Sequence, residues 1–85
     1  MSWILNARRH GIEVSYKNAR SKTQTEISIS KRVGKVKFEE RYIVDTHVLE
    51  DKQQICMLYD KFRLGLVSWY NGNKVKLNLP DEEII

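Results

Sequence analysis

The chain has 85 residues, of which 41% are hydrophobic and 31% charged, and it carries a net charge of +4 and one cysteine. This length accommodates one domain, and this composition argues against an intrinsically disordered chain. No apolar run approaches the roughly 20 residues of a membrane-spanning helix, and a lone cysteine excludes an internal disulfide. The sequence therefore predicts a cytoplasmic protein without membrane contact, with residues 1–80 as one domain and residues 81–85 as a tail.

The charge is unevenly distributed along the chain. Residues 1–37 hold nine lysines and arginines against two glutamates, whereas residues 38–85 hold six lysines and arginines against nine acidic residues. A basic N-terminal part attracts phosphate backbones or an acidic protein surface. Alternatively, the lysines only keep a strand-rich surface soluble and protect its edges.

Three segments alternate apolar and polar residues with the period of two that is typical of β-strands: residues 11–17, 25–31 and 35–44. A turn at Val33 and Gly34 pairs Ile29 with Phe38, and a loop between the first two segments pairs Ile12 with Ile29. Both pairings put the same residues on one apolar face, which predicts a three-stranded antiparallel meander.

Glu40 interrupts this apolar face, where the predicted register places it opposite Ile27. We interpret the interruption as a β-bulge or as the rim of the sheet. The alternative is a buried carboxylate with a partner.

The period then changes from two to that of a helix. Asp51 is a candidate N-cap with Gln54 in a capping-box position, and Gly65 is a candidate stop. Between them, one apolar stripe has helical spacing: Ile55, Leu58, Tyr59 and Phe62. Residues 52–63 also contain a continuous apolar run that is compatible with a strand, and the two end signals favour the helix.

The last segment has the pattern of a β-hairpin. Asn71-Gly72 is a strong signal for a two-residue turn, and it divides two strands within residues 66–79. One face of this hairpin is apolar, while Trp69, Lys74 and Lys76 point the other way. Pro80 ends the second strand.

The predicted order is therefore β-β-β-α-β-β in a small antiparallel domain of the mainly β or α+β class. This element order is that of an OB-like barrel, a likeness of topology alone. The alternative with the same order is a curved sheet packed on one helix.

No constellation in the sequence predicts catalysis, a cofactor or a metal site. His10 and His47 belong to no known metal-ligand spacing, and Cys56 lies in an apolar run where a thiol is usually inert. Asp45 and His47 share a strand face in the predicted sheet and form a possible acid–base pair, although exposed surface residues are the favoured interpretation. The sequence therefore predicts a protein that is not an enzyme.

Binding is the better-supported class of function. In an OB-type barrel, ligands cross the second and third strands and the loops that here span residues 17–24 and 71–73. Lysine and arginine neutralise phosphates there, and Trp69 stacks on a base unless it packs under the N-terminal segment. The candidate binding residues are Lys17, Arg20, Lys22, Arg32, Lys35, Lys37, Arg41, Trp69, Lys74 and Lys76.

We therefore expect a basic β-surface that binds single-stranded DNA or RNA. The alternative is a protein–protein interaction module that acts as a small regulator or inhibitor of a larger protein, for example one that handles nucleic acid. The apolar residues at 3–5 and 84–85 leave both a monomer and a small homo-oligomer open.

Overall fold

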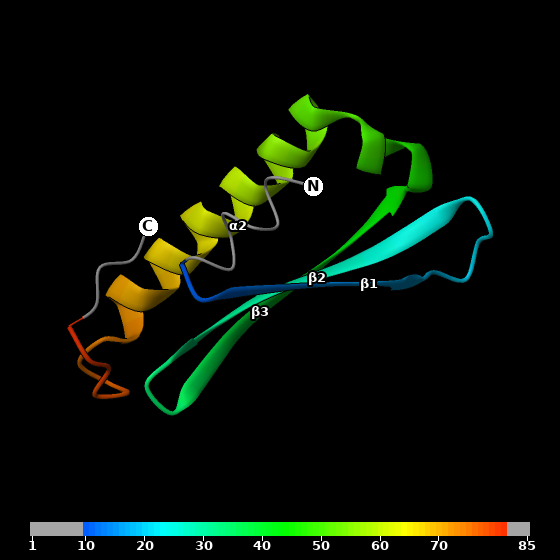
Figure 1. Cartoon of the computed structure of the whole chain (residues 1–85). Helices are drawn as coiled ribbons and strands as arrows, with labels where there is room; N and C mark the ends of the chain where they lie inside the picture. The colour runs from blue at the N-terminus through cyan, green and yellow to red at the C-terminus, as the bar shows by residue number, and fades with distance from the viewer. Residues whose placement is uncertain (1–9, 82–85) are drawn as a thin grey trace.

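The computed structural model of the chain describes residues 10–81, which form a sheet and a helix in two layers (Figure 1). The apolar residues 3–5 and 84–85 lie outside this range. The elements are the strands β1 (Ile12–Asn18), β2 (Gln24–Val33) and β3 (Val36–Asp45), the short 3-10 helix η1 (Thr46–Glu50) and the helix α2 (Lys52–Asn73). The antiparallel sheet has the order β1-β2-β3, so the domain belongs to the α+β class.

The predicted meander is confirmed, but both of its registers differ by two residues. Ile12 pairs with Lys31 instead of Ile29, and Ile29 pairs with Glu40 instead of Phe38. The loop between β2 and β3 consists of Gly34 and Lys35, and it is closed by the pair Val33 and Val36. Gly34 has φ +62°, which fits the first position of a type II′ turn. A shift of two residues keeps every side chain on its predicted face, because successive strand residues alternate between the faces.

Glu40 lies on the face that α2 covers, and no bulge re-aims it. The pairing of β2 with β3 is continuous from Gln24 and Asp45 to the closing turn, so the bulge interpretation is wrong. Because β3 is an edge strand, the half-buried Glu40 lies at the rim of the inner face. Its Oε1 is 3.9 Å from where a Cβ on Gly65 would lie, so the helix approaches closely here.

The N-terminal half of α2 follows the prediction. The Asp51 carboxylate accepts hydrogen bonds from the backbone N–H groups of Gln53 at 3.1 Å and Gln54 at 3.4 Å. The Gln54 side chain donates back to Asp51 at 3.1 Å. Ile55 and Phe62 are buried. Residues 52–63 are therefore helical and pack through the expected stripe.

The predicted hairpin at residues 66–79 is wrong, because α2 continues to Asn73. Leu66, Trp69 and Tyr70 extend the stripe that starts at Ile55, and this helical packing outweighs the local turn signal of Asn71-Gly72. Gly65 does not stop the helix. Its missing side chain instead leaves room for the Phe38 ring, which lies 3.6 Å from where a Cβ would be.

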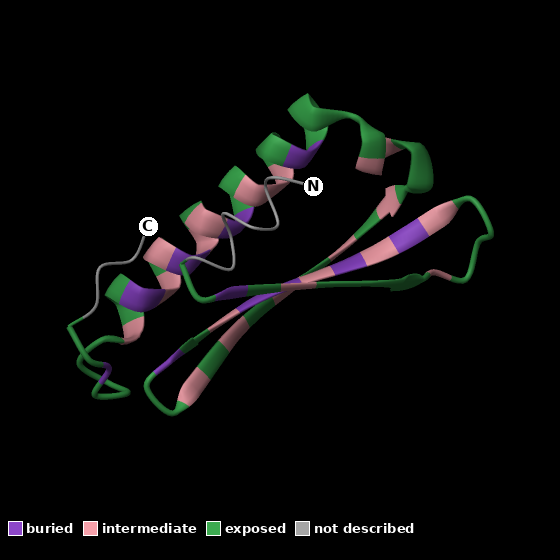
Figure 2. Ribbon diagram, in the orientation of Figure 1, coloured by how far each residue is buried: buried purple, intermediate pink, exposed green. Residues whose placement is uncertain are grey.

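The core lies between the sheet and α2, as the buried residues in Figure 2 show. Its main cluster comprises Ile12, Ile27, Ile29, Ile55, Phe62 and Leu66. A second cluster joins Val33 and Tyr70 to Leu79, so the chain that follows α2 folds back onto the end of the sheet. Residues 10–81 thus form a three-stranded sheet packed on one helix, which agrees with the second predicted architecture except for its last two strands, and no barrel closure is seen in this part of the chain.

Replacing Gly72 by alanine distinguishes the helix from the predicted hairpin, because the two structures predict changes of opposite sign in the free energy of unfolding. Nothing lies within 4 Å of where a Cβ on Gly72 would be, so in α2 alanine should raise the free energy of unfolding by about 0.5–1 kcal/mol. In an Asn-Gly turn, where glycine has positive φ, the same change would lower stability. Urea unfolding of the two proteins measures the sign, and a loss of stability would contradict the helix.

Candidate functional site

The face of the sheet that points away from α2, called the outer face below, is polar. Alternation along the strands puts these residues there: Glu13, Ser15 and Lys17 from β1; Gln24, Glu26, Ser28, Ser30 and Arg32 from β2; and Lys37, Glu39, Arg41, Ile43 and Asp45 from β3. These positions include no aromatic residue, so they offer bases no stacking platform. They also hold as many acidic as basic side chains.

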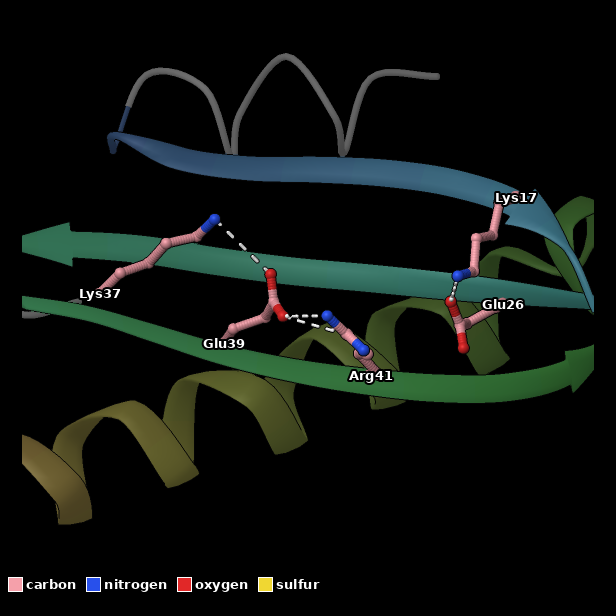
Figure 3. A network of polar contacts seen from close by, with 5 residues as sticks. All are labelled: Lys17, Glu26, Lys37, Glu39 and Arg41. Atoms are coloured by element: carbon pink, nitrogen blue, oxygen red, sulfur yellow. Dashed lines mark hydrogen bonds and ion pairs between the residues drawn. The ribbon is translucent and has the colours of Figure 1, made fainter.

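Ion pairs join several of these charges to each other (Figure 3). Glu39 lies between two cations on β3, with its carboxylate 3.0 Å from Nη2 of Arg41 and 3.6 Å from Nζ of Lys37. Lys17 lies opposite Glu26 across β1 and β2, and their charged atoms are 3.1 Å apart. Exposed pairs of this kind add little stability, but each lowers the local positive charge.

Among the candidate binding cations on the sheet and its loops, four have no ion-pair partner within residues 10–81, and they are called the end cations below: Arg20, Lys22, Arg32 and Lys35. All four are exposed. Arg20 and Lys22 lie in the loop between β1 and β2, whereas Arg32 and Lys35 lie at the turn between β2 and β3. The ten residues of β2 separate the two groups by about 30 Å.

The turn between β2 and β3 concentrates positive charge. Arg32 and Lys37 lie directly opposite each other on the outer face, and Lys35 is in the turn beside them. Like charges at opposed positions destabilise a sheet. An anion bound at this end would relieve the repulsion.

Two hollows lie along the outer face between the end cations. One, near the β2–β3 turn, is lined by Glu13, Val14, Ser15, Ser28, Ser30, Lys37 and Glu39. The other, near the β1–β2 loop, is lined by Lys17, Asn18, Ala19, Arg20, Gln24, Glu26 and Ile43. The first forms because three serines lie beside longer side chains, and their hydroxyl groups are possible hydrogen-bond partners for a ligand.

The structure separates three candidate residues from this face. Trp69 is half-buried between the layers, with its ring centroid 5.3 Å from that of Phe38, so it is not an exposed stacking residue. Lys74 pairs with Asp81, and their hydrogen bond raises the pKa of Lys74 and lowers that of Asp81. Lys76 is exposed after the end of α2. Each had been expected beside the sheet cations because of the incorrect hairpin.

The residues considered for chemistry are not brought together. Asp45 ends β3 and His47 lies in η1, so they share no strand. Cys56 is exposed on α2. Residues 10–81 contain no group of three or more His, Cys, Asp or Glu residues that could hold a metal ion.

The comparisons with known proteins find no relative. The chain matches no protein-family model, no curated protein and no solved structure. None of the helices within residues 10–81 is long and apolar enough to cross a membrane. Function is therefore inferred from the outer face and its charges.

Proposed function

We propose that this protein is a non-catalytic binding protein that holds nucleic acid by its phosphate backbone, across the outer face of the sheet. The observation that supports this most directly is the position of the end cations. Two lie at each end of a polar face that no other element within residues 10–81 covers, and none of the four has an ion pair to another residue of that range. A cation without an internal partner binds a phosphate without first breaking an ion pair.

The spacing of the end cations favours a duplex over a single strand. The two groups are about 30 Å apart, and one turn of B-form DNA is about 34 Å long. Phosphates one turn apart on a strand face the same side of the duplex, so a single surface contacts both. The expected preference for single strands rested on stacking by Trp69, which packs against Phe38 instead.

The centre of the outer face suits backbone contacts more than base stacking. The hydroxyl groups of Ser15, Ser28 and Ser30 line the hollow between the two ends, and serine is a common phosphate ligand. The paired Lys37 and Arg41 can exchange Glu39 for a phosphate oxygen. We therefore propose binding with little sequence preference and with a strong dependence on salt.

A protein partner is the second candidate, supported by the balance of acidic and basic side chains on the same face. Lys37, Glu39 and Arg41 alternate in charge along β3, and they would match a partner surface on which acidic, basic and acidic groups follow one another. In that case the protein is a small interaction module or regulator. Binding to such a partner would survive nuclease treatment, whereas binding through nucleic acid would not.

Neutralising the end cations tests the proposal. The variant Arg32→Gln/Lys35→Gln should weaken binding to a labelled 20-base-pair duplex, and the plot of log affinity against log salt should become shallower by about 2. Fluorescence anisotropy at several salt concentrations measures both. Exposed side chains of this kind have small effects on stability, so circular dichroism should show an intact fold.

The control for this variant is Lys52→Gln/Lys61→Gln, which removes the same charge from exposed positions of α2. We expect the control to bind like the unchanged protein. Equal weakening by both variants would show that net charge alone matters, and it would overturn the assignment of binding to the outer face.

A further inference from the structure

The free edge of β3 is a long set of unsatisfied backbone groups. Val33 and Val36 close a two-residue turn, so they exchange backbone hydrogen bonds, and every second residue of β3 does so after them. The residues in between direct their N–H and C=O groups away from β2. These outward positions are Lys37, Glu39, Arg41, Ile43 and Asp45.

Within residues 10–81, no backbone hydrogen bond joins another element to this edge. The strand has ten residues, contains no proline and has no bulge, so several features that usually protect a sheet edge are missing. Ile43 is 62% exposed on the outer face. Met57 is 68% exposed, beside a hollow on the α2 side of the strand, which is lined by Val44, Val48, Gln54, Met57, Leu58 and Lys61.

We propose that β3 pairs with β3 of a second copy of this chain, antiparallel and centred on Arg41, to form a continuous six-stranded sheet. This register follows from the outward positions. Only a two-fold axis at Arg41 pairs all of them with one another: Lys37 with Asp45, Glu39 with Ile43, and Arg41 with itself. A register shifted by two residues leaves at least one outward position without an outward partner.

The side chains in this register are complementary on the outer face. Lys37 lies opposite Asp45 of the second copy, and the two-fold axis makes this attraction twice. The two Arg41 side chains meet at the axis, but each is held by Glu39 of its own strand at 3.0 Å. Glu39 also lies diagonal to Arg41 of the second copy, so the charges around the axis alternate in sign.

The inner face is compatible with the same register. Glu40 is an inward charge of the kind that protects sheet edges. In this register it faces Tyr42 of the second copy, so the two Glu40 carboxylates do not face each other. The Tyr42 hydroxyl is a hydrogen-bond donor for that carboxylate. Phe38 of the second copy lies opposite Val44, at the mouth of the hollow that contains Met57. This assembly does not depend on nucleic-acid binding, although it would extend the outer face over two copies.

Disulfide trapping tests the register directly. In a Cys56→Ser background, the variant Arg41→Cys should form a covalent dimer under mild oxidation, because Arg41 faces itself at about 5.5 Å between Cα atoms. The matched control Ile43→Cys lies on the same edge, but it faces Glu39 of the second copy. It should cross-link at least about tenfold more slowly, because its self-distance exceeds the reach of a disulfide. Equal rates, or no dimer from either variant, would overturn the proposal.

A charge swap gives a second readout. Lys37→Asp and Asp45→Lys should each raise the dimer dissociation constant about two- to thirtyfold, since each removes two cross-strand attractions. The double variant should return it to within about twofold of the original value, because it restores the pair in reverse. Sedimentation equilibrium measures all four proteins. A chain that is monomeric at every concentration, or a double variant no better than the singles, would refute this pairing.

Discussion

Replacing Phe62 by alanine is expected to lower the free energy of unfolding by about 3–5 kcal/mol. The Phe62 side chain is fully buried between α2 and the sheet, and its ring centroid lies 5.6 Å from that of Phe38. Its removal would leave a cavity at the centre of the main cluster. A domain of this size has a total stability of about 4–13 kcal/mol, so the variant should lose much of it. Thermal or urea unfolding measures the change.

The control for Phe62 is Leu64→Ala, two residues along the same helix. Leu64 is 73% exposed, so its truncation should change stability by less than about 0.5 kcal/mol. Should Phe62→Ala fail to fold, Phe62→Leu should fold with an intermediate loss of stability. If Leu64→Ala lowered the free energy of unfolding as much as Phe62→Ala or Phe62→Leu does, α2 would have to pack through a different face.

Replacing Gly34 by alanine is the second large effect, with an expected loss of at least about 1–2 kcal/mol. Gly34 has φ +62°, a backbone conformation that side chains with a Cβ rarely adopt. A Cβ at this position would also lie 3.1 Å from Cδ of Pro80, where the C-terminal segment folds back over the turn. Both effects strain the type II′ turn that sets the β2–β3 register.

The two causes can be separated in a Pro80→Ala background. This change removes the ring that Gly34→Ala would meet, so the substitution should cost less there, and the remaining loss measures the backbone strain. Urea unfolding of the four proteins gives both values. A neutral or stabilising Gly34→Ala would show that the turn does not use positive φ at residue 34.

The meander was predictable because two independent patterns agreed. The period-two segments of β1, β2 and β3 put the same apolar set on one face under either pairing, and the structure preserves that set. Between β2 and β3, the error of two residues came from the turn. Gly34 is the first loop residue of a type II′ turn and Lys35 the second, whereas the prediction placed the loop at Val33 and Gly34.

The hairpin was mispredicted because a local signal was weighed above a longer one. Asn71-Gly72 is a strong turn dipeptide, but Phe62, Leu66, Trp69 and Tyr70 continue the helical stripe that Ile55 starts. Leu66, Trp69 and Tyr70 lie beyond the predicted helix, and these three buried or half-buried side chains on one helix face stabilise the structure more than one favourable turn does. The spacing of these residues was the signal that could have revealed the longer helix.

The binding residues were predicted in part. The strand cations were placed on the correct face, since alternation determines which way they point. Their neutralisation was missed, although Lys37, Glu39 and Arg41 alternate in sign at every second position and therefore lie side by side. Trp69 was misplaced together with the hairpin. No local pattern indicated which candidate cations of the sheet and its loops would stay without an ion pair in residues 10–81, namely Arg20, Lys22, Arg32 and Lys35.

The most direct test of the proposed function is the salt dependence of duplex binding by the unchanged protein. Four end cations that each neutralise one phosphate predict a slope of about −3.6 for log affinity against log salt. Between 50 and 200 mM salt, this slope corresponds to a loss of affinity of about 150-fold. Anisotropy of a labelled duplex measures it. A slope close to zero, or no binding even at the lowest salt concentration, would contradict the account.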